Sequence, residues 1–567
     1  MTRETERAGS RANAMPHGKY RAFAPVDLPD RTWPGRTLTR APRWCSVDLR
    51  DGNQALIDPM RPEEKLRFWD LLLGIGLEEI EVGFPAASQI DFDFVRKIIT
   101  EDRIPDNVLI QVLCQARQEL IARTVDSLKG ARRAIFHLYN STSTLQREVV
   151  FGMSRAEIVK LALDGVAHVK RECERIPDTE VILEYSPESF TGTELEFAVE
   201  VCSAVAQSWG VGPDRRMIVN LPATVEMSTP NIYADQIEWF CRNFPEREYC
   251  TVSLHTHNDR GTGVAASELG VLAGADRVEG TLFGNGERTG NVCLVTLAMN
   301  LFSQGVDPQL DLSDMRHIRA VAESCNKIPV PVRHPYAGDL VFTAFSGSHQ
   351  DAIRKGMARV DETQWAVPYL PIDPADVGSH YRETVRLNSQ SGKGGVAFVL
   401  ENYFELTLPR PLLQEFARVI QEVADRDGGE LAPAALRSVF DATYLKVTGP
   451  YRLERYELDN ITLDDGSDGM RCRMVLSVSG QSMESRGEGA GPVEAFVHGV
   501  ERAINEGFGV EYFHEQSEET GSAARALCLV GLKDAGGEVC WGAGASRNTL
   551  TASFEAVLAA LNRRWSR

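Results

Sequence analysis

The alternation of β-branched runs with helical patterns is the feature of this sequence that most restricts its fold. From Arg43 onward, each apolar run ends in polar or glycine residues and leads into a stretch with helical periodicity. The runs lie at residues 43–52, 78–85, 107–116, 133–141, 180–189, 216–224, 250–259 and 276–288. Eight β-then-α units over about 260 residues match the count and length of a (β/α)₈ barrel. A doubly wound open sheet is the alternative, but no G-x-G-x-x-G motif follows the first run.

The helical stretches between the runs carry their own start and stop signals. Residues 61–76 begin with Pro62 and two glutamates and end near glycine, as the polarity of a helix requires. Residues 191–210 and 229–244 repeat this pattern. The sequence therefore predicts an α/β fold in which helices surround a parallel barrel.

The seventh run contains the stretch SLHTHNDRGTG, with His255 and His257 two residues apart. In a helix these two side chains would not share a face, but in a strand alternate side chains point the same way. The run therefore predicts two imidazoles that project together. A polar strand end that binds no metal is the alternative interpretation.

Catalytic groups of a (β/α)₈ barrel lie where the strands end and the βα loops begin. This sequence places polar residues at those positions: Arg50, Asp51, Gln115, Arg117, His137, Ser186, Glu188, Thr224, Asn258, Asp259 and Asn291. His137 taken alone fits an ordinary packed or solvated residue. The histidine pair is different, because the first and seventh strands are separated only by the eighth in a closed barrel. Two imidazoles, a carboxylate and an amide oxygen suit a divalent cation: Mg²⁺ or Mn²⁺, with Zn²⁺ as an alternative.

Composition excludes several classes of function. The length of 567 residues predicts two to four domains. The net charge of −19, without a block of Lys or Arg, argues against nucleic acid as a partner. The 11 cysteines form no C-x-x-C pair, which favours reduced thiols and a cytoplasmic location. No apolar run reaches the roughly 18 residues that a membrane helix requires, and residues 1–40 are expected to form a flexible N-terminal arm.

Several longer motifs carry a family resemblance. The stretches DLRDGNQ, SLHTHNDRG and LFGNGERTGN resemble the Claisen-condensing acyltransferases that include isopropylmalate, homocitrate and citramalate synthases. EYSPES, NLPATVE, AFSGSHQDAI, VPYLPIDPADVG and NSQSGKGG are similar to the long bacterial and fungal form of the isopropylmalate synthases. The resemblance runs from about Tyr20 to the C-terminus.

The resemblance implies roles for the residues at the strand ends. It implies that Asp51, His255 and His257 bind the metal, with Asn291 at or beside it. A 2-oxo acid would chelate this metal, and Arg50 would stabilise the developing alkoxide while Glu188 orients Arg50. Glu188 could instead form a structural ion pair. The other residues that the resemblance places in the substrate pocket are Leu113, His137, Ser186 and Thr224.

Two residues beyond the barrel complete the implied catalytic set. The resemblance associates His349 and Tyr369 with removal of a proton from the acetyl methyl group of acetyl-CoA. They fall in a linker that resembles one crossing to the partner subunit of a homodimer. From the sequence alone, each residue fits an ordinary surface position. The short segment GMARVDETQ lies between them and leaves both residues present.

The last 130 or so residues are expected to form a separate domain. After RDGGELAP at 426–433, the sequence shows two copies of one plan, a βββα-type duplication with GEGAGPVEAF and GAGASRNTL before the helices. A glycine-rich turn at a helix start suits an anion such as an amino-acid carboxylate. A duplication without a ligand is the alternative, and a nucleotide is disfavoured because no GK[ST] motif is present. The resemblance implies a domain that binds L-leucine as an allosteric inhibitor.

These features predict four segments: an arm at 1–40, a catalytic barrel at 41–310, a linker region at 311–425 and a regulatory domain at 426–567. The implied reaction joins acetyl-CoA to 3-methyl-2-oxobutanoate. Rival functions are homocitrate or citramalate synthesis, a carbon–carbon lyase, and a catalytically inactive leucine sensor. Small apolar walls at Leu113 and Ser186 favour an isopropyl group over a second carboxylate. The sequence leaves open whether K⁺ acts as an activator.

Overall fold

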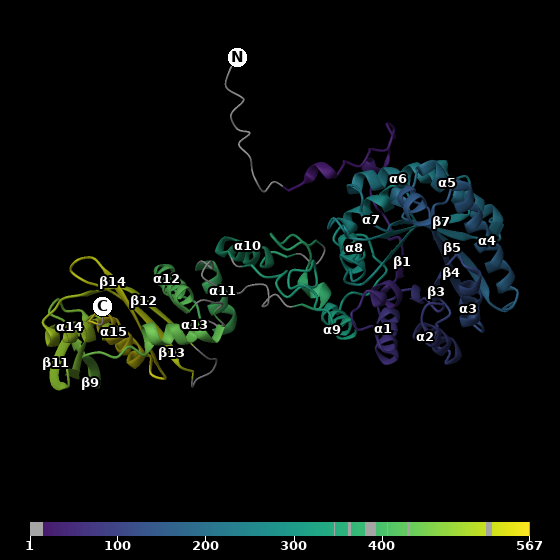
Figure 1. Ribbon diagram of the computed structural model, residues 1–567. Coiled ribbons are helices and arrows are strands. Elements are labelled where there is room, and N and C mark those ends of the chain that lie inside the picture. Colours follow the sequence, from purple (N-terminus) through teal and green to yellow (C-terminus); the bar gives the residue numbers. More distant parts are fainter. Residues whose placement is uncertain are drawn as a thin grey trace, which may run out of the picture. The chain divides into compact units, whose positions relative to one another are not determined.

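The computed structural model describes residues 15–344, 346–360, 364–379, 393–404, 406–427, 431, 433–517 and 524–565. The chain forms two compact units, one of residues 1–341 with 375–378 and one of residues 342–374 with 379–567 (Figure 1). Parts of three predicted segments fall outside the described residues: 1–14 of the arm, 361–363 of the short loop, and most of NSQSGKGG. In the described part of the chain, no helix has the length and apolar character to cross a membrane.

The first unit contains a closed barrel of eight parallel strands in the order β1 to β8, which confirms the predicted fold (Figure 1). Its strands are β1 (Arg43–Ser46), β2 (Glu79–Gly83), β3 (Leu109–Gln115), β4 (Arg133–Ser141), β5 (Glu180–Glu188), β6 (Met217–Ala223), β7 (Cys250–Thr256) and β8 (Arg277–Gly280). The helices of this unit are α1 (Pro62–Gly74), α2 (Gln89–Thr100), α3 (Gln118–Leu128), α4 (Arg155–Cys173), α5 (Leu195–Trp209), α6 (Pro230–Asn243), α7 (Gly263–Leu272), α8 (Leu294–Phe302) and α9 (Met315–Asn326).

The first and last strands are shorter than predicted. β1 ends at Ser46, and residues Asp48–Gly52 form a π-helical turn instead of continuing the strand. β8 ends at Gly280, where a Cβ atom would lie 2.6 Å from the carbonyl oxygen of Val292. The chain after β8 therefore folds back onto the end of its own strand. Only glycine permits an approach this close.

The interior of the barrel changes character along its axis. An apolar cluster of Leu109, Ile135, Ile182 and Ile218 packs on strands β3 to β6. Toward the other end of the strands the interior contains buried charged and polar residues, among them Glu81, Gln111, Arg277 and Glu279. The largest of these residues is Arg277, whose side chain is fully buried.

The segment before β1 is attached to the barrel through α6. The Glu238 carboxylate accepts hydrogen bonds from the backbone N–H and hydroxyl of Thr32 and from the N–H of Trp33. The Trp33 indole donates to Asp235 at 2.7 Å. This part of the predicted flexible arm is therefore bound to the surface of the barrel.

The second unit contains two copies of a βββα plan, as predicted. One sheet has the order β11-β10-β9 and the other β12-β13-β14. The copies consist of β9 (Tyr451–Thr462), β10 (Asp468–Val478), β11 (Gln481–Gly489) and α14 (Pro492–Ile504), then β12 (Gly509–Ser517), β13 (Ala526–Lys533), β14 (Val539–Ser546) and α15 (Thr549–Trp565). The other helices of this unit are α10 (Gly347–Met357), α11 (Lys393–Phe404), α12 (Arg410–Asp427) and α13 (Pro433–Phe440).

One apolar core of the second unit crosses the predicted boundary at residue 426. Leu400 of α11 and Phe416 of α12 pack in the same cluster as Leu529 of β13 and Trp541 of β14. The helices that were assigned to the linker region therefore cover the second sheet.

Four of the five glycines in the glycine-rich stretches of the second unit lie in strands β11 and β14, whereas Gly491 is the N-cap of α14. A Cβ atom on Gly487 of β11 would lie 2.2 Å from the Ala495 carbonyl oxygen of α14. A Cβ atom on Gly542 of β14 would lie 2.2 Å from the backbone nitrogen of Ala560 in α15. These glycines let each helix lie directly on its sheet. The anion site at the helix starts stays a prediction.

We expect Glu238→Gln to weaken the attachment of the N-terminal segment in a pH-dependent way. Burial raises the pKa of Glu238, but the hydrogen bonds from Thr32 and Trp33 outweigh this and lower the pKa to about 2. Its contribution to stability is therefore complete above about pH 4.5 and is lost as the pH falls toward 2. At pH 7 the variant should lose roughly 1–3 kcal/mol of stability. Between pH 5 and 3 its melting temperature should fall less steeply than that of the wild type.

Thermal melts across this pH range check the expectation, with Glu248→Gln as the control because Glu248 is an exposed glutamate in the loop that follows α6. Identical pH slopes for wild type and Glu238→Gln would show that this contact does not hold the segment.

Candidate metal centre and active site

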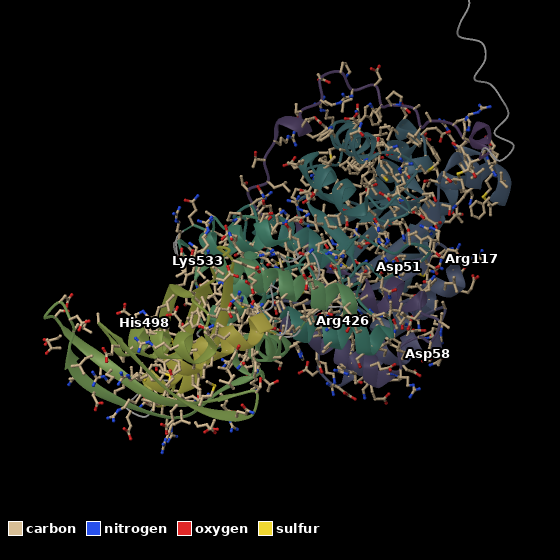
Figure 2. All side chains as sticks on the ribbon, turned by 90° about the vertical axis from the view of Figure 1, so that its left-hand side faces the viewer. Asp51, Asp58, Arg117, Arg426, His498 and Lys533 are labelled. Atoms are coloured by element: carbon tan, nitrogen blue, oxygen red, sulfur yellow. The ribbon has the colours of Figure 1, made fainter. Side chains whose placement is uncertain are left out.

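The carboxyl ends of the barrel strands surround a pocket of about 570 Å³. A volume of this size is typical of small-molecule sites. The predicted residues that line it are Arg50, Asp51, Leu113, His137, Ser186, Glu188, Thr224, His255 and His257. Asp51 lies within the body of the barrel, whereas Asp58, a few residues later, lies at its edge (Figure 2). The structure thus brings residues from six strands or their following loops together in one pocket.

Asp51, His255 and His257 form the compact centre of this pocket. Potential ligand atoms of the three residues lie within 4.8 Å of one another, and all three residues are buried. The Oδ2 atom of Asp51 lies 3.2 Å from Nε2 of His255 and 3.8 Å from Nε2 of His257. The histidine rings project from β7 and the residue after it, with centroids 5.3 Å apart. The structure therefore brings the predicted ligands together.

Asn291 lies next to this centre, since it forms an isolated antiparallel bridge with His257. Its Nδ2 donates to the Asn285 carbonyl at 3.0 Å, which fixes the orientation of the amide. Its Oδ1 is buried and has no hydrogen-bond partner among the described residues. A buried acceptor without a donor is costly unless a cation or water satisfies it. This orphaned oxygen fits a fourth metal ligand.

The electrostatics of the centre also favour a cation. Burial raises the pKa of Asp51, but Arg50 and His255 outweigh this and hold the pKa well below its ordinary value. Burial lowers the pKa of His255, but hydrogen bonds to Asp51 and Glu279 raise it to about 9. Burial and the charge of His255 together lower the pKa of His257 to about 4. Protonated His255 thus donates to Glu279 from Nδ1 and to Asp51 from Nε2, and a divalent cation fits in place of the Nε2 proton.

Arg50 is oriented by Glu81 and not by Glu188, which corrects the prediction. Its Nε donates to the Glu81 carboxylate at 2.5 Å, and its Nη1 lies 3.2 Å from Asp51 Oδ1. Glu188 instead accepts a hydrogen bond from the Ser141 hydroxyl. Glu81 is fully buried, so this ion pair is shielded from solvent. Glu188 remains in the pocket lining as a partly accessible carboxylate.

The turn that carries Arg50 and Asp51 is clamped by a buried lysine. Lys65 of α1 is fully buried, and its Nζ donates to the Leu49 carbonyl at 3.2 Å and to Asp91 at 2.5 Å. Asp91 of α2 in turn accepts from the backbone N–H of Phe84 at 2.9 Å. Two helices and two loops are joined by this one ion pair. It restricts the position of the turn at the mouth of the barrel.

Two of the predicted substrate-pocket residues, His137 and Ser186, belong to a second hydrogen-bonded group. His137 contacts the Ser186 hydroxyl through Nε2 at 2.7 Å and Glu81 through Nδ1 at 2.9 Å. Ser186 also accepts from Asn220 at 3.0 Å. Thr224 accepts from the backbone N–H of Ser189 at 2.9 Å, and Leu113 contributes an apolar wall. Glu81 therefore connects this group to Arg50.

His349 and Tyr369 belong to the second unit and lie close to each other. Their rings are stacked, with centroids 3.9 Å apart and planes 25° apart. Both side chains are exposed, and Tyr369 has a φ of 67°, in the left-handed region that residues other than glycine rarely adopt. The two residues that the resemblance singles out are therefore neighbours within their own unit.

The sequence interpretation missed Glu81, Gln111, Arg277 and Glu279, which support the site from below. The signal was present in two of the strands, since Glu79 and Glu81 alternate in β2, and Arg277 and Glu279 alternate in β8. Like His255 and His257, the two residues of each pair lie on one face of their strand. This alternation is the signal that could have placed them in the interior of the barrel.

The fold and this centre define a class: a (β/α)₈ barrel with a metal-binding cluster at its carboxyl end. Residues 41–322 match the HMGL-like family. Residues 339–401 match the family described as alpha-isopropylmalate synthase, post-catalytic domain-like, and residues 430–565 match the LeuA allosteric (dimerisation) domain.

Similarity to curated proteins extends over nearly the whole chain. A 2-isopropylmalate synthase of Parafrankia sp. (strain EAN1pec) is 55% identical over 559 residues, covering 97% of this chain and 98% of the relative. The corresponding synthases of Kineococcus radiotolerans and Pseudomonas putida (strain GB-1) are 56% and 52% identical, with similar coverage. The chain belongs to the 2-isopropylmalate synthase family, whose members are Claisen-condensing acyltransferases.

We expect the intact protein to bind about one divalent ion per chain at the Asp51 centre. Asp51→Asn or His255→Ala should reduce the affinity for this ion by at least about tenfold, because each removes one of few ligands. Calorimetric titration of the metal-depleted chain with Mg²⁺, Mn²⁺ or Zn²⁺ measures the change. The barrel should remain folded in both variants, since strand-end ligands lie outside its packed layers.

Asp58→Asn provides the matched control, because Asp58 is an exposed aspartate that pairs with Lys327. Wild-type affinity in Asp51→Asn and His255→Ala would place the metal elsewhere.

Proposed function

We propose that this chain is a 2-isopropylmalate synthase that condenses acetyl-CoA with 3-methyl-2-oxobutanoate and water to give 2-isopropylmalate and free CoA. In this reaction a new carbon–carbon bond joins the acetyl methyl carbon to the keto carbon, and water cleaves the thioester. The strongest support is the similarity to synthases of this name over 97% of the chain. The Asp51 centre and the pocket above it supply the chemistry that such a condensation needs.

The walls of the pocket support a 2-oxo acid with a branched apolar side chain. Leu113, Phe84 and Pro222 provide apolar surface. A second substrate carboxylate, as in homocitrate synthesis, would call for an available basic residue. Arg288 also lines the pocket, but its guanidinium is bound to Asp259 at 2.7 Å and to the Thr224 carbonyl. The isopropyl group of 3-methyl-2-oxobutanoate therefore suits this pocket better than a dicarboxylate.

The residues of the barrel divide the work on the 2-oxo acid. A divalent cation at the Asp51 centre would polarise the keto group when bound. Arg50, fixed by Glu81, is positioned beside this centre to stabilise the negative charge that develops on the keto oxygen. Thr224 would bind the substrate carboxylate, and His137 and Ser186 would line the same pocket. Because Arg50 is held by a buried carboxylate, little reorganisation is required during the reaction.

The acetyl group needs a base, because its methyl protons are weakly acidic. We assign this step to His349 and Tyr369, whose stacked rings offer an imidazole and a phenol side by side. Glu188, as an accessible carboxylate of the pocket, is the third polar group available to the reacting molecules. We propose a homodimer in which one chain supplies His349 and Tyr369 to the barrel of the other.

Two rival functions make different demands. A homocitrate or citramalate synthase would prefer another 2-oxo acid, and a carbon–carbon lyase would run the reaction in reverse without a regulatory tail. The match of residues 430–565 to an allosteric domain argues against the lyase. We propose that L-leucine binds in this domain and inhibits the enzyme. Mg²⁺ is the proposed cation, with Mn²⁺ or Zn²⁺ as alternatives, and K⁺ as a proposed activator.

Substrate choice is tested by a thiol-release assay with acetyl-CoA and a panel of 2-oxo acids. We expect kcat/KM for 3-methyl-2-oxobutanoate to exceed that for pyruvate, glyoxylate and 2-oxoglutarate by at least about tenfold, which corresponds to roughly 1.4 kcal/mol of transition-state discrimination. Leu113→Ala should reduce the preference in kcat/KM for 3-methyl-2-oxobutanoate over larger 2-oxo acids, because the smaller side chain widens the pocket. A clear preference for 2-oxoglutarate or glyoxylate would overturn the substrate assignment.

Substitution of His349 or Tyr369 should affect the chemical step more than binding of the 2-oxo acid. We expect His349→Ala and Tyr369→Phe to lower kcat by roughly 10²–10⁴-fold with little change in KM for 3-methyl-2-oxobutanoate. His168→Ala serves as a control, because His168 lies on α4 of the barrel and is not part of the pocket.

Mixing Asp51→Asn chains with His349→Ala chains tests the shared site. Hybrid dimers should recover activity if each barrel uses the partner's base. Absence of recovery after verified subunit exchange would contradict the crossed arrangement.

Leucine regulation is tested by hydrogen exchange on the full chain, since truncation at residue 426 would cut the core that α12 shares with β14. L-leucine should slow exchange within residues 451–565 at concentrations that inhibit turnover, because a bound ligand stabilises the form that binds it. D-leucine is the control. Inhibition by L-leucine with protection confined to the barrel pocket would indicate competition with substrate instead of allostery.

A further inference from the structure

The ring nitrogen of His255 that points away from Asp51 is held by a buried carboxylate. Nδ1 of His255 lies 2.8 Å from Oε2 of Glu279. The two residues are register partners on the adjacent strands β7 and β8, so the backbone ladder itself sets their separation. The other ring nitrogen, Nε2, faces Asp51. His255 thus lies between Asp51 on one side and Glu279 on the other.

Glu279 is surrounded by donors and is fully buried. Its carboxylate accepts hydrogen bonds from Arg277 and Gln111 at 2.8 Å each and from Asn220 at 3.3 Å. Arg277 and the two amide groups can only donate at these nitrogens. Glu279 therefore has no role here except as an acceptor, and the proton of the contact with His255 belongs to Nδ1.

Arg277 holds this carboxylate in place from below. Its guanidinium also donates to Glu79 at 2.5 Å, to Gln111 Oε1 at 2.7 Å and to Ser253 at 2.8 Å. The arginine is bound on several sides by partners on four different strands. Neither its guanidinium nor the carboxylate of Glu279 can shift without breaking several bonds.

We propose that Glu279 is a positioning residue that fixes His255 with Nδ1 protonated and Nε2 presented to the cation, and that Arg277 anchors Glu279. This inference rests on the proposed function, because the cation belongs to that function. Outer partners of metal-binding histidines set the tautomer and the orientation of the ring, and their loss weakens metal binding about 10–100-fold. Without Glu279, the Nδ1–H group loses its acceptor, and the ring is free to turn so that Nδ1 faces the centre in place of Nε2.

The cluster of His137, Glu184 and Glu279 could also be considered as a second cation site, since its ligand atoms lie within 4.8 Å of one another. Arg277 argues against this interpretation. Its Nη1 lies 2.8 Å from Glu279 and 3.4 Å from Glu184, so a permanent cation already occupies that position. The cluster supports the Asp51 centre and does not duplicate it.

The test compares metal affinity in the full-length protein without substrates. Glu279→Gln keeps the shape of the side chain but replaces one acceptor oxygen with a donor group. His255 then competes with the other donors around this side chain for the one acceptor oxygen that remains. We expect its Kd for Zn²⁺ or Mn²⁺, measured by competition with a chelator, to rise about 10–100-fold. Glu279→Asp retains the charge and should recover part of the affinity. Saturating metal should restore part of kcat in Glu279→Gln.

Glu79→Gln is the matched control, because Glu79 binds the same guanidinium and does not contact His255. Both glutamine variants should lose thermal stability, but Glu79→Gln should bind metal within about twofold of the wild type. Equal affinities in Glu279→Gln and wild type would overturn the proposal. Equal losses in Glu279→Gln and Glu79→Gln would also overturn it, since they would reduce Glu279 to a structural role.

A second measurement uses the wild-type protein and therefore does not require that a variant folds. In a crystal structure of the wild-type protein loaded with Zn²⁺, His255 should bind the ion through Nε2 and donate from Nδ1 to Glu279. Coordination through Nδ1 would overturn the proposal. Wild-type protein that binds no divalent ion would overturn the proposed function itself, which separates the two failures.

Discussion

The ion pairs of Arg277 are the constraint on which the rest of the barrel depends. A guanidinium with no exposure to solvent is tolerated only when carboxylates and acceptors surround it. Here Glu79 and Glu279 provide the charge, and Gln111 and Ser253 complete the hydrogen bonds. These partners come from strands on opposite sides of the interior. The polar interior therefore joins the strands through hydrogen bonds and ion pairs. Branched apolar side chains would fill the same space without such directional bonds.

The same network determines how the site is held. Gln111 donates both to Glu279 and to Glu81, so the support of His255 and the support of Arg50 share a residue. Glu81 is bonded to Arg50 and to His137. A carboxylate buried this deeply cannot relax into water when one partner is removed. The residues around the pocket are consequently held by groups for which the loss of a hydrogen-bond partner is costly.

The sequence pattern predicted strands β2 to β7 well because each is a short run with several β-branched or other apolar residues that ends in polar residues or glycine. It failed at β1 and β8, where polar residues that follow the strand look like its continuation. The histidine pair could be predicted because alternation in a strand is a local property. The partner of Arg50 could not, because the choice between Glu81 and Glu188 depends on which strand lies nearer in the closed barrel. The role of the glycines at 487 and 542 could not be predicted from the sequence either, because a glycine suits a turn and a close backbone contact equally well.

The ligands of the proposed metal centre come from both ends of the barrel sequence. Asp51 follows β1, His255 and His257 belong to β7 or its end, and Asn291 follows β8. β1 and β8 are joined by parallel pairing from Arg43 with Arg277 to Ser46 with Gly280, the seam that closes the cylinder. The four ligands can meet only after this seam has formed. A folding intermediate in which the first strand has not yet joined the last therefore has no complete metal site, so a cation at this centre would stabilise the closed barrel over such an intermediate.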